Sequence, residues 1–415
     1  MHSHAMSDHS NPHTLSGAAL EQRFAELDQF LLEHQALWRP RPFVHYPTLP
    51  WETDHPELAH WLRQQSLEHA DSAHNQPHQL KGAPDPFPRL AATAARLSQL
   101  GAHPQTATTS IPARLSNGIP GRKWEQINAF SRSLHFARPP THWLDWCSGK
   151  GHLGRLLARD GAQLTCLEYD AELVRSGQQL SDKLGIPAQH IQQDVLAAGA
   201  TLQLKTAHTP VALHACGELH TRLLQLASAA NCSQLAIAPC CYNRISTQRY
   251  QPLSQQAQQS ALMLDIDDLG LPLSETVTAG ARVKRQRDQS MAWRLGFDLL
   301  QRELRGENSY LSIPSLPAAY LDKSFDTFCK DLAKLKELPE PKAQNWPALE
   351  QLGWQRLAVV RNLELLRNIF RRPLELWLLL DRALYLKASG YQVKLGTFCA
   401  YEQSPRNLLL LAEHH

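Results

Sequence analysis

A glycine-rich turn between two short apolar runs is the feature that most constrains the fold of this chain. The runs cover residues 143–146 and 164–167, leucines follow the turn at helical spacing, and Glu168 closes the second run. The turn has the spacing G-x-G-x-x-G, formed by Gly149, Gly151 and Gly154. This order predicts a strand, a tight turn, a helix and a second strand.

The physical properties of this unit favour a nucleotide-like ligand. Glycines let the backbone approach a ligand closely, and the amides at the start of the new helix favour negative charge. An acid at the end of the second strand, here Glu168, can bridge two ribose hydroxyls. The alternative is a tight strand-to-helix turn that binds no ligand.

The composition of the chain indicates an intracellular protein of ordinary charge. Its 415 residues suffice for two or three domains or for one elaborated domain, and its formal net charge of +3 requires no acidic partner. Eight scattered cysteines are typical of reduced thiols, and the polar N-terminal stretch does not resemble a signal peptide. The most apolar run, residues 374–386, is too short and too charged to span a bilayer. We therefore expect a soluble, cytoplasmic protein without a membrane partner.

Apolar runs and helical patterns alternate after the glycine-rich unit, which predicts a parallel sheet with right-handed crossovers. Further strands are expected over residues 186–195, 210–214 and 235–238. A long helical stretch then precedes two more strands, 391–398 and 407–412, which would complete a seven-stranded sheet. Ligands of such sheets bind at the carboxyl ends of the strands. The polar residues at or near these ends are Asp145, Glu168, Asp194 and His214.

Two classes of ligand fit the glycine-rich unit, namely a dinucleotide and S-adenosylmethionine. Three features favour S-adenosylmethionine. Asp145 precedes the turn, where a carboxylate could meet the amino group of a methionine moiety, and Asp194 follows the third strand near the expected adenine. The helix and strand pair at the C-terminal end also suit methyltransferases better than dehydrogenases.

Three short motifs, DWCSGKGHLG, ALHACGEL and IAPCCY, resemble in this order the signatures of one methyltransferase family. The family contains tRNA acceptor-stem 2′-O-methyltransferases, the methyltransferase-like proteins once labelled rRNA adenine dimethylase domain-containing, and the C-terminal domain of a glutathione-S-transferase-like protein. GRKWEQI at 121–127 resembles the basic motif of the family, with Trp124 in place of its histidine, and SPRNLLLLA resembles the ending of some members. The resemblance covers about 116–245 and 364–415.

The resemblance implies a class I methyltransferase domain of the Rossmann-like α/β fold that uses S-adenosylmethionine. We expect this domain to comprise residues 116–242 and 364–415. A helical N-terminal region, 1–115, and a largely helical insertion, 243–363, would then flank or interrupt it, and the insertion is a candidate for substrate recognition.

The motifs assign residues to two sides of the expected site. The residues expected to bind the cofactor are Asp145, Cys147, Gly149, Lys150, Gly151, Gly154, Glu168, Asp194 and Val195. The residues expected at the methyl-transfer site are His214, Cys240, Cys241 and Tyr242 as catalytic candidates, with Lys123, Cys216 and Pro239 as substrate contacts. Ala238 stands where some amino-methylating enzymes carry an Asx residue, which argues against an amino acceptor, whereas Tyr242 could stack on a flat one.

The cysteines at the ends of the fourth and fifth expected strands have three interpretations. They can pack at the strand ends or line the site, or one can act as a nucleophile that a neighbour such as His214 activates. They can also bind zinc together with His214. However, two adjacent cysteines are poorly spaced for tetrahedral coordination, and the sequence has no C-x-x-C motif, so no metal is expected. His214 itself is either a structural hydrogen-bonding residue or an acceptor contact and general base.

The acceptor favoured by the sequence is RNA, either tRNA or rRNA. Basic clusters that could contact RNA are formed by Arg282, Lys284, Arg285 and Arg287, and by Arg367, Arg371 and Arg372, although solvated surface is the alternative for both. A protein acceptor stays open. The rival hypothesis from another class is a non-catalytic module that binds the cofactor or RNA with the same fold.

Overall fold

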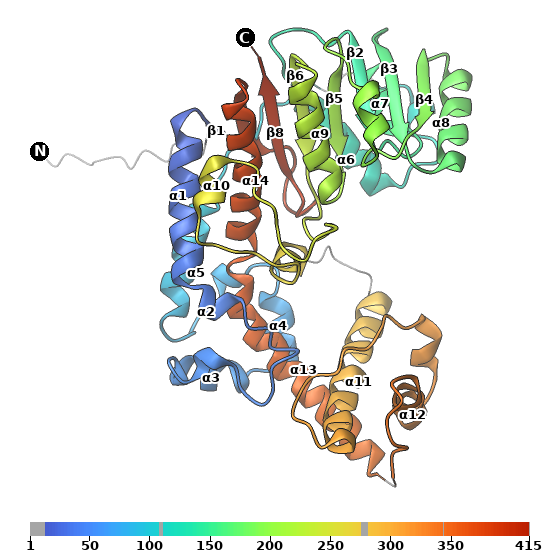
Figure 1. Cartoon of the computed structure of the whole chain (residues 1–415). Helices are drawn as coiled ribbons and strands as arrows, with labels where there is room; N and C mark the ends of the chain where they lie inside the picture. Colours follow the sequence, from blue (N-terminus) through green and yellow to red (C-terminus); the bar gives the residue numbers. More distant parts are fainter. Residues whose placement is uncertain (1–12, 108–110, 275–280, 343, 415) are drawn as a thin grey trace, which may run out of the picture. The chain divides into compact units, whose positions relative to one another are not determined.

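The strands expected from the sequence form one mixed sheet in the computed structural model, which describes residues 13–107, 111–274, 281–342 and 344–414 (Figure 1). The strands are β1 (Leu15–Ser16), β2 (His142–Trp146), β3 (Gln163–Glu168), β4 (Ala188–Gln192), β5 (Thr209–Leu213), β6 (Gln234–Ala238), β7 (Gln392–Thr397) and β8 (Leu408–Glu413). Their order across the sheet is β1-β7-β8-β6-β5-β2-β3-β4. Neighbouring strands among β2 to β6 are parallel, and β8 is antiparallel to both β6 and β7.

The expected number of seven strands is one too few. Each strand predicted from the sequence is present, but the two-residue β1 pairs antiparallel with β7 and makes the sheet eight-stranded. A strand of two residues has no periodicity for a sequence pattern to reveal. The central strands β5 and β6 are almost entirely buried, which explains why they appear in the sequence as continuous apolar runs rather than as alternating ones.

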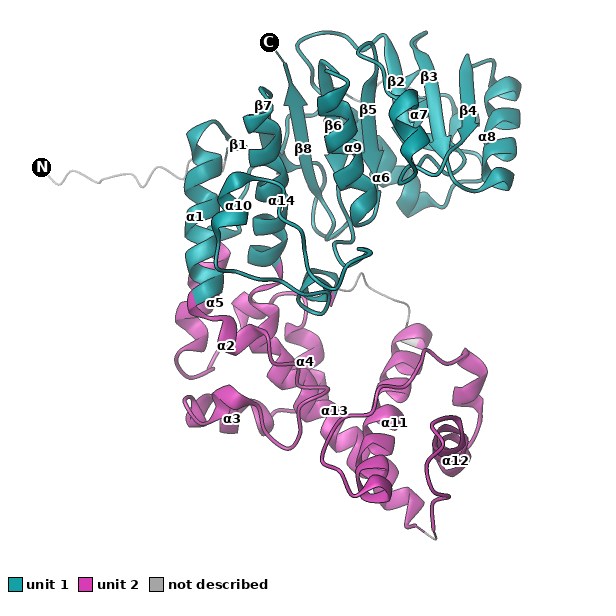
Figure 2. Ribbon diagram, viewed as in Figure 1, with its two compact units in different colours: residues 1–32, 97–273, 372–415 teal, residues 33–96, 274–371 magenta. Residues whose placement is uncertain are grey.

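The chain divides into two compact units, each assembled from segments distant in sequence (Figure 2). The first contains the sheet and comprises residues 1–32, 97–273 and 372–415, and the second comprises 33–96 and 274–371. These units group the chain differently from the three segments proposed from the sequence. The second unit joins the middle of the proposed N-terminal region to the greater part of the proposed insertion.

The helices of the first unit connect and cover the strands. They are α1 (Ala18–Glu33), α6 (Gly121–Arg132), α7 (His152–Leu157), α8 (Ala171–Leu184), α9 (Glu218–Ala229), α10 (Gln255–Gln259) and α14 (Arg371–Ala388), with 3₁₀ turns at Ala113–Leu115, Ala198–Gln203 and Asp268–Ser274. Helix α7 packs on β2 and β3, α8 on β3 and β4, and α9 on β5. Asp170 begins α8 because its carboxylate accepts hydrogen bonds from the amides of Glu172 and Leu173.

The long apolar helix expected near the C-terminal end is interrupted before Pro373 rather than at it. Helix α13 (Trp346–Asn368) ends first, and α14 begins at Arg371, so that Pro373 lies in the first turn of α14. A proline is tolerated there because the amides of a first turn have no partner within the helix. Within the first unit, Trp377 of α14 donates a hydrogen bond to Asp28 of α1 over 2.8 Å.

The second unit is helical in its described residues. Its helices are α2 (Gln35–Trp38), α3 (Pro56–Arg63), α4 (Leu67–Ala73), α5 (Phe87–Leu97), α11 (Ala281–Arg305), α12 (Phe325–Leu335) and α13, with 3₁₀ turns at Pro50–Glu52, Pro77–Gln79 and Ala318–Asp322. Helices α11 and α13 pack closely at Gly296 and Gly353. A Cβ added to Gly353 would lie 2.4 Å from the carbonyl oxygen of Ala292, so only glycine allows this approach.

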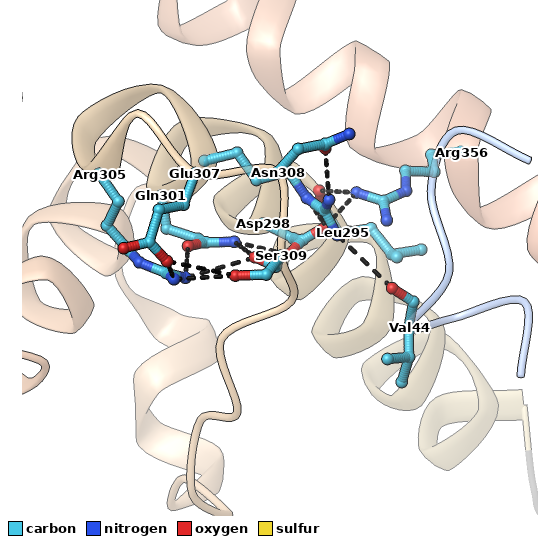
Figure 3. A network of polar contacts seen from close by, with 10 residues as sticks. Val44, Leu295, Asp298, Gln301, Arg305, Glu307, Asn308, Ser309 and Arg356 are labelled. Atoms are coloured by element: carbon cyan, nitrogen blue, oxygen red, sulfur yellow. Dashed lines mark hydrogen bonds and ion pairs between the residues drawn. The ribbon is translucent and has the colours of Figure 1, made fainter.

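A polar network is buried at the contact between α11 and α13 (Figure 3). The carboxylate of Asp298 accepts hydrogen bonds from Arg356 over 2.6 Å, from Arg302 over 3.0 Å and from Gln301 over 2.9 Å. Asp298 is 2% exposed, and the two arginines are also buried. One buried carboxylate is therefore shared by two guanidinium groups inside the second unit.

None of the helices in the described part of the chain contains a segment that is both long and apolar enough to cross a membrane.

Candidate active site

The glycine-rich turn lies at the carboxyl ends of β2 and β3 and is tied to Glu168. The amide of Gly149 donates to one carboxylate oxygen of Glu168 over 2.8 Å, and the amide of Asp170 donates to the other over 3.1 Å. Cys147, Gly149 and Gly151 have positive φ angles of 56°, 57° and 71°. The turn thus folds back over the end of β3 and places the Glu168 carboxylate against the glycine backbone.

Asp145 is buried beneath this turn. Its Oδ2 accepts a hydrogen bond from the amide of Gly154 over 2.9 Å, and the residue is 3% exposed. Burial raises the pKa of this carboxyl to about 7, although the Gly154 amide and the nearby charges of Arg155 and Lys123 oppose the shift. Asp145 therefore titrates close to neutral pH.

The last two glycines of the motif are required by close packing. A Cβ on Gly151 would lie 2.6 Å from the His190 ring, and one on Gly154 would lie 2.6 Å from Leu164 and 3.1 Å from Asp145. Gly154 thus brings α7 against β3 and its amide against the Asp145 carboxylate. No neighbouring atom lies near a Cβ on Gly149, whose positive φ alone favours glycine.

The remaining expected cofactor residues lie around the same strand ends. The amide of Gln193 donates to the carbonyl of Glu168 over 2.8 Å, which brings the segment carrying Asp194 and Val195 to the end of β3. Asp194 is exposed and Val195 is buried. Lys150 is exposed on the turn. Burial raises the pKa of the Cys147 thiol to about 12, so Cys147 is a neutral thiol.

His214 follows β5 and is oriented by a residue that the sequence motifs did not single out. Its Nε2 lies 2.9 Å from Oε1 of Gln126 on α6, and its own φ is 67°. Burial, together with the charge of Lys123, lowers the pKa of the imidazole, which keeps the ring neutral. Gln126 follows Lys123 by three residues on α6, so the spacing within GRKWEQI would have placed both on one helical face.

Lys123 lies where it influences both halves of the site. Its charge affects the pKa values of Asp145 beside the glycine turn and of His214 beyond β5. The side chain is exposed at the start of α6. A cation at this end of a helix is unfavourable unless an anion is nearby, so its position favours an anionic ligand.

The loops after β5 and β6 bring three cysteines together. Sγ of Cys216 lies 3.3 Å from Sγ of Cys240, which lies 3.7 Å from Sγ of Cys241. The sulfur atoms of all three residues lie within 4.8 Å of one another. Hydrogen bonding from Cys240 lowers the pKa of Cys216, which favours the thiolate form of that side chain. The imidazole of His214 does not belong to this group.

Tyr242 occupies a different environment from the one its motif suggested. Its ring is fully buried, forms an edge contact with His220 at 5.9 Å between ring centroids, and lies 5.1 Å from the guanidinium of Arg382. In this conformation neither face is open to a flat acceptor. Stacking on an acceptor is therefore not what the buried ring does here, and the residue supports the loop instead. Pro239 and Ala238 are also buried before the cysteines.

The two basic clusters predicted from the sequence differ in how far their side chains are engaged. Lys284 pairs with Asp71 over 2.7 Å, whereas Arg282 and Arg285 are exposed. The arginines of the other cluster bond to groups of their own units: Arg367 to the carbonyl of Trp38, Arg371 to the carbonyl of His74, and Arg372 to Glu375 and Asn407. The second cluster is therefore largely structural.

Residues 122–248 match the model of a family described as a methyltransferase domain. This part of the chain is a methyltransferase domain. It includes the glycine turn, the His214 strand end and the three clustered cysteines. The expected enzyme class and cofactor are thus confirmed for this domain, whereas the narrower tRNA and rRNA family stays a prediction.

One curated relative is a glutathione S-transferase C-terminal domain-containing protein of Xenopus laevis, 28% identical over 142 residues. The match covers 34% of this chain, and the chain spans only 22% of the relative's length.

Two solved methyltransferase structures are similar to this chain, both with low TM-scores. Coclaurine N-methyltransferase bound to N-methylheliamine and SAH has a TM-score of 0.27 and 13% identity over 85% of this chain and 95% of its own. The plantazolicin methyltransferase BpumL in complex with SAH has a TM-score of 0.22 and 16% identity over 52% and 69%. Similarity this weak carries nothing about the acceptor.

Proposed function

We propose that the protein is an S-adenosylmethionine-dependent methyltransferase that acts on RNA, with tRNA or rRNA as the acceptor. The observation that carries the proposal is the meeting of two sets of residues at the carboxyl edge of one sheet. The glycine turn with Asp145 and Glu168 forms the first set, and His214 with the clustered cysteines forms the second. A methyl donor on the first set would face an acceptor on the second.

The residues of the first set fit the cofactor by their chemistry. Glu168 would accept from the ribose hydroxyls, and Asp145 would face the methionine amino group. Asp194 and Val195 would lie beside the adenine, with one exposed carboxylate and one buried apolar side chain. The bound cofactor supplies an electrophilic methyl group on a sulfonium, so the protein needs mainly to align the acceptor and exclude water.

His214 is suited to remove a proton from an acceptor hydroxyl. In the tautomer in which Nε2–H donates to Oε1 of Gln126, Nδ1 carries the free lone pair of a neutral ring. The lowered pKa keeps that lone pair available at neutral pH. Gln126 and Tyr242 would then act as positioning residues, one for the imidazole and one for the loop that carries the cysteines.

The acceptor class rests on charge at the mouth of the site and on the resemblance of the motifs to tRNA methyltransferases. Lys123 and Lys150 are exposed, and Lys123 acts electrostatically on both halves of the site. Ammonium groups in such a position would bind backbone phosphates of RNA. All eight cysteines are free thiols, which suits the reducing cytoplasm that we propose as the compartment.

Mass spectrometry of RNA and ribosomal protein from cells lacking the protein tests the acceptor. We expect one methyl mark to be lost from tRNA or rRNA and to return with the wild-type protein but not with His214→Ala. A mark lost only from protein would replace RNA by a protein acceptor. Unchanged marks, together with tight cofactor binding by the purified chain, would favour a non-catalytic module instead.

The affinity for S-adenosylmethionine is expected to rise with pH up to about 7 and to level off above it. Burial raises the pKa of the Asp145 carboxyl from its ordinary value of 3.8 to about 7. The carboxyl therefore binds a proton more tightly in the folded protein than a solvent-exposed carboxyl does. Below that pKa, pairing with the methionine ammonium requires release of this proton, so affinity falls by up to about tenfold per pH unit.

Calorimetry measures the affinity for S-adenosylmethionine from about pH 5.5 to about pH 8.5, a range that spans a titration with a pKa near 7. Buffers of different ionisation enthalpy should reveal release of nearly one proton below pH 7. Asp145→Asn should bind weakly with a flat pH profile. A wild-type profile as flat as that of Asp145→Asn would contradict the assigned role of the carboxylate.

A further inference from the structure

The three clustered cysteines form a geometry that neither methyl transfer nor simple packing requires. We propose that Cys216, Cys240 and Cys241 bind a thiophilic metal ion, with zinc as the expected occupant. The inference concerns a site beside the expected methyl acceptor and does not depend on which acceptor is used.

The distances among the sulfur atoms match those of a tetrahedral metal–thiolate site. Two thiolates bound to one zinc ion at about 2.3 Å lie about 3.8 Å apart. The observed separations are 3.3 Å between Cys216 and Cys240 and 3.7 Å between Cys240 and Cys241, and all three sulfurs lie within 4.8 Å. Small movements of the side chains would therefore place the sulfurs around one ion.

The backbone holds the two cysteine loops together in advance. The amide of Gly217 donates to the carbonyl of Cys241 over 2.5 Å, and the amide of Glu218 donates to the carbonyl of Arg244 over 3.0 Å. A Cβ on Gly217 would lie only 1.9 Å from the Arg244 carbonyl oxygen. The loops after β5 and β6 therefore meet without space between them, which preorganises the thiols as a ligand set.

Two cationic side chains act on the cluster. Arg244 acts electrostatically on Cys216, and Arg406 acts on Cys241. A divalent ion bound by the three sulfur atoms would replace the thiol protons, which leave on binding.

The ligand set has an open side. Cys240 is buried, whereas Cys216 and Cys241 are partly exposed, so solvent reaches the cluster. Three protein ligands leave the fourth tetrahedral position for water or another ligand, as in sites that are not purely structural. His214 does not supply that ligand in this structure, because its imidazole does not lie with the three sulfur atoms. The adjacency of Cys240 and Cys241 in sequence does not prevent both sulfurs from facing Cys216.

Cobalt and zinc titrations of the reduced, chelator-treated chain of 415 residues test the site. We expect one ion per chain and an intense near-ultraviolet charge-transfer band with cobalt, which zinc then removes. Cys216→Ser, Cys240→Ser and Cys241→Ser should each weaken the band and lower the affinity by at least tenfold. Cys399→Ser, which changes a partly exposed thiol outside the group, should bind like the wild type.

Alkylation of the wild-type protein provides a test that requires no substitution. Zinc should protect all three clustered thiols from the reagent, as mapped by mass spectrometry, without protecting Cys399. Cobalt binding without a thiolate band would overturn the proposal. So would a stable Cys216–Cys240 disulfide in protein that retains no metal, because the thiols would then be a redox pair. These measurements use neither S-adenosylmethionine nor RNA, so their failure is distinct from a failure of the proposed function.

Discussion

Glu168→Ala is expected to weaken binding of S-adenosylmethionine by at least about 100-fold, because two hydrogen bonds to a charged group contribute about 1.5–3 kcal/mol each. In the structure the carboxylate accepts from the amides of Gly149 and Asp170, which fixes the glycine turn at the end of β3. We infer that the same carboxylate also binds the ribose hydroxyls. The substitution would therefore remove ligand contacts and loosen the turn that approaches the cofactor.

Two matched variants separate these effects in calorimetric titrations. Glu168→Gln keeps the length and one acceptor oxygen, so its affinity should lie between those of the wild type and Glu168→Ala. Glu172→Gln changes an acid in the first turn of α8 and should leave the affinity unchanged. If Glu168→Ala binds as tightly as Glu172→Gln, the glycine turn is not the cofactor site, and the proposed function fails with it.

Local patterns in the sequence located the strands because burial on both faces produces continuous apolar runs. The predicted strand over 235–238 and the observed β6 differ by one residue, and the site residues follow from strand ends that share one edge of the sheet. The sequence could not reveal β1, whose two residues carry no period. It also suggested that Tyr242 could stack on an acceptor, whereas the ring is buried and packs against Arg382, which lies far along the chain.

Other features depend on contacts that local periodicity does not encode. The side-chain amide of Asn362 on α13 donates to the carbonyl of Ser66 over 2.8 Å, although almost 300 residues separate them in sequence. Helix α4, which directly follows Ser66, packs on α13, so the second unit joins two regions that the sequence presented as separate. The proximity of Cys216 to the adjacent Cys240 and Cys241 likewise follows from the pairing of β5 with β6.

The second large effect is expected from Asp298→Ala, which should destabilise the second unit by about 3–5 kcal/mol. The substitution leaves Arg302 and Arg356 buried without the carboxylate that both contact. A buried charge that loses its partner costs more than a lost surface pair, because water does not replace the missing interaction. Arg356 also lies 4.3 Å from the Tyr46 ring centroid, a contact that holds the guanidinium in place and limits its escape to solvent.

Hydrogen exchange at the amides of α11 and α13 measures this loss within the second unit. We expect faster exchange in both helices of Asp298→Ala and a lower denaturant midpoint for the chain. Asp326→Ala is the matched control, because Asp326 pairs with Lys330 across an exposed turn of α12 and its loss should change little.

A triple variant distinguishes the effect of leaving the arginine charges unpaired from the effect of lost side-chain packing. Asp298→Leu combined with Arg302→Met and Arg356→Met removes all three charges and keeps similar side-chain volume. Buried ion networks replaced by apolar residues of similar size are often as stable as the original, so this variant should recover most of the protection that Asp298→Ala loses. If the triple variant is as unstable as Asp298→Ala, shape rather than uncompensated charge governs the contact between α11 and α13. If Asp298→Ala is as stable as the wild type, the network contributes nothing to that contact, and the close approach at Gly296 and Gly353 must hold the two helices alone.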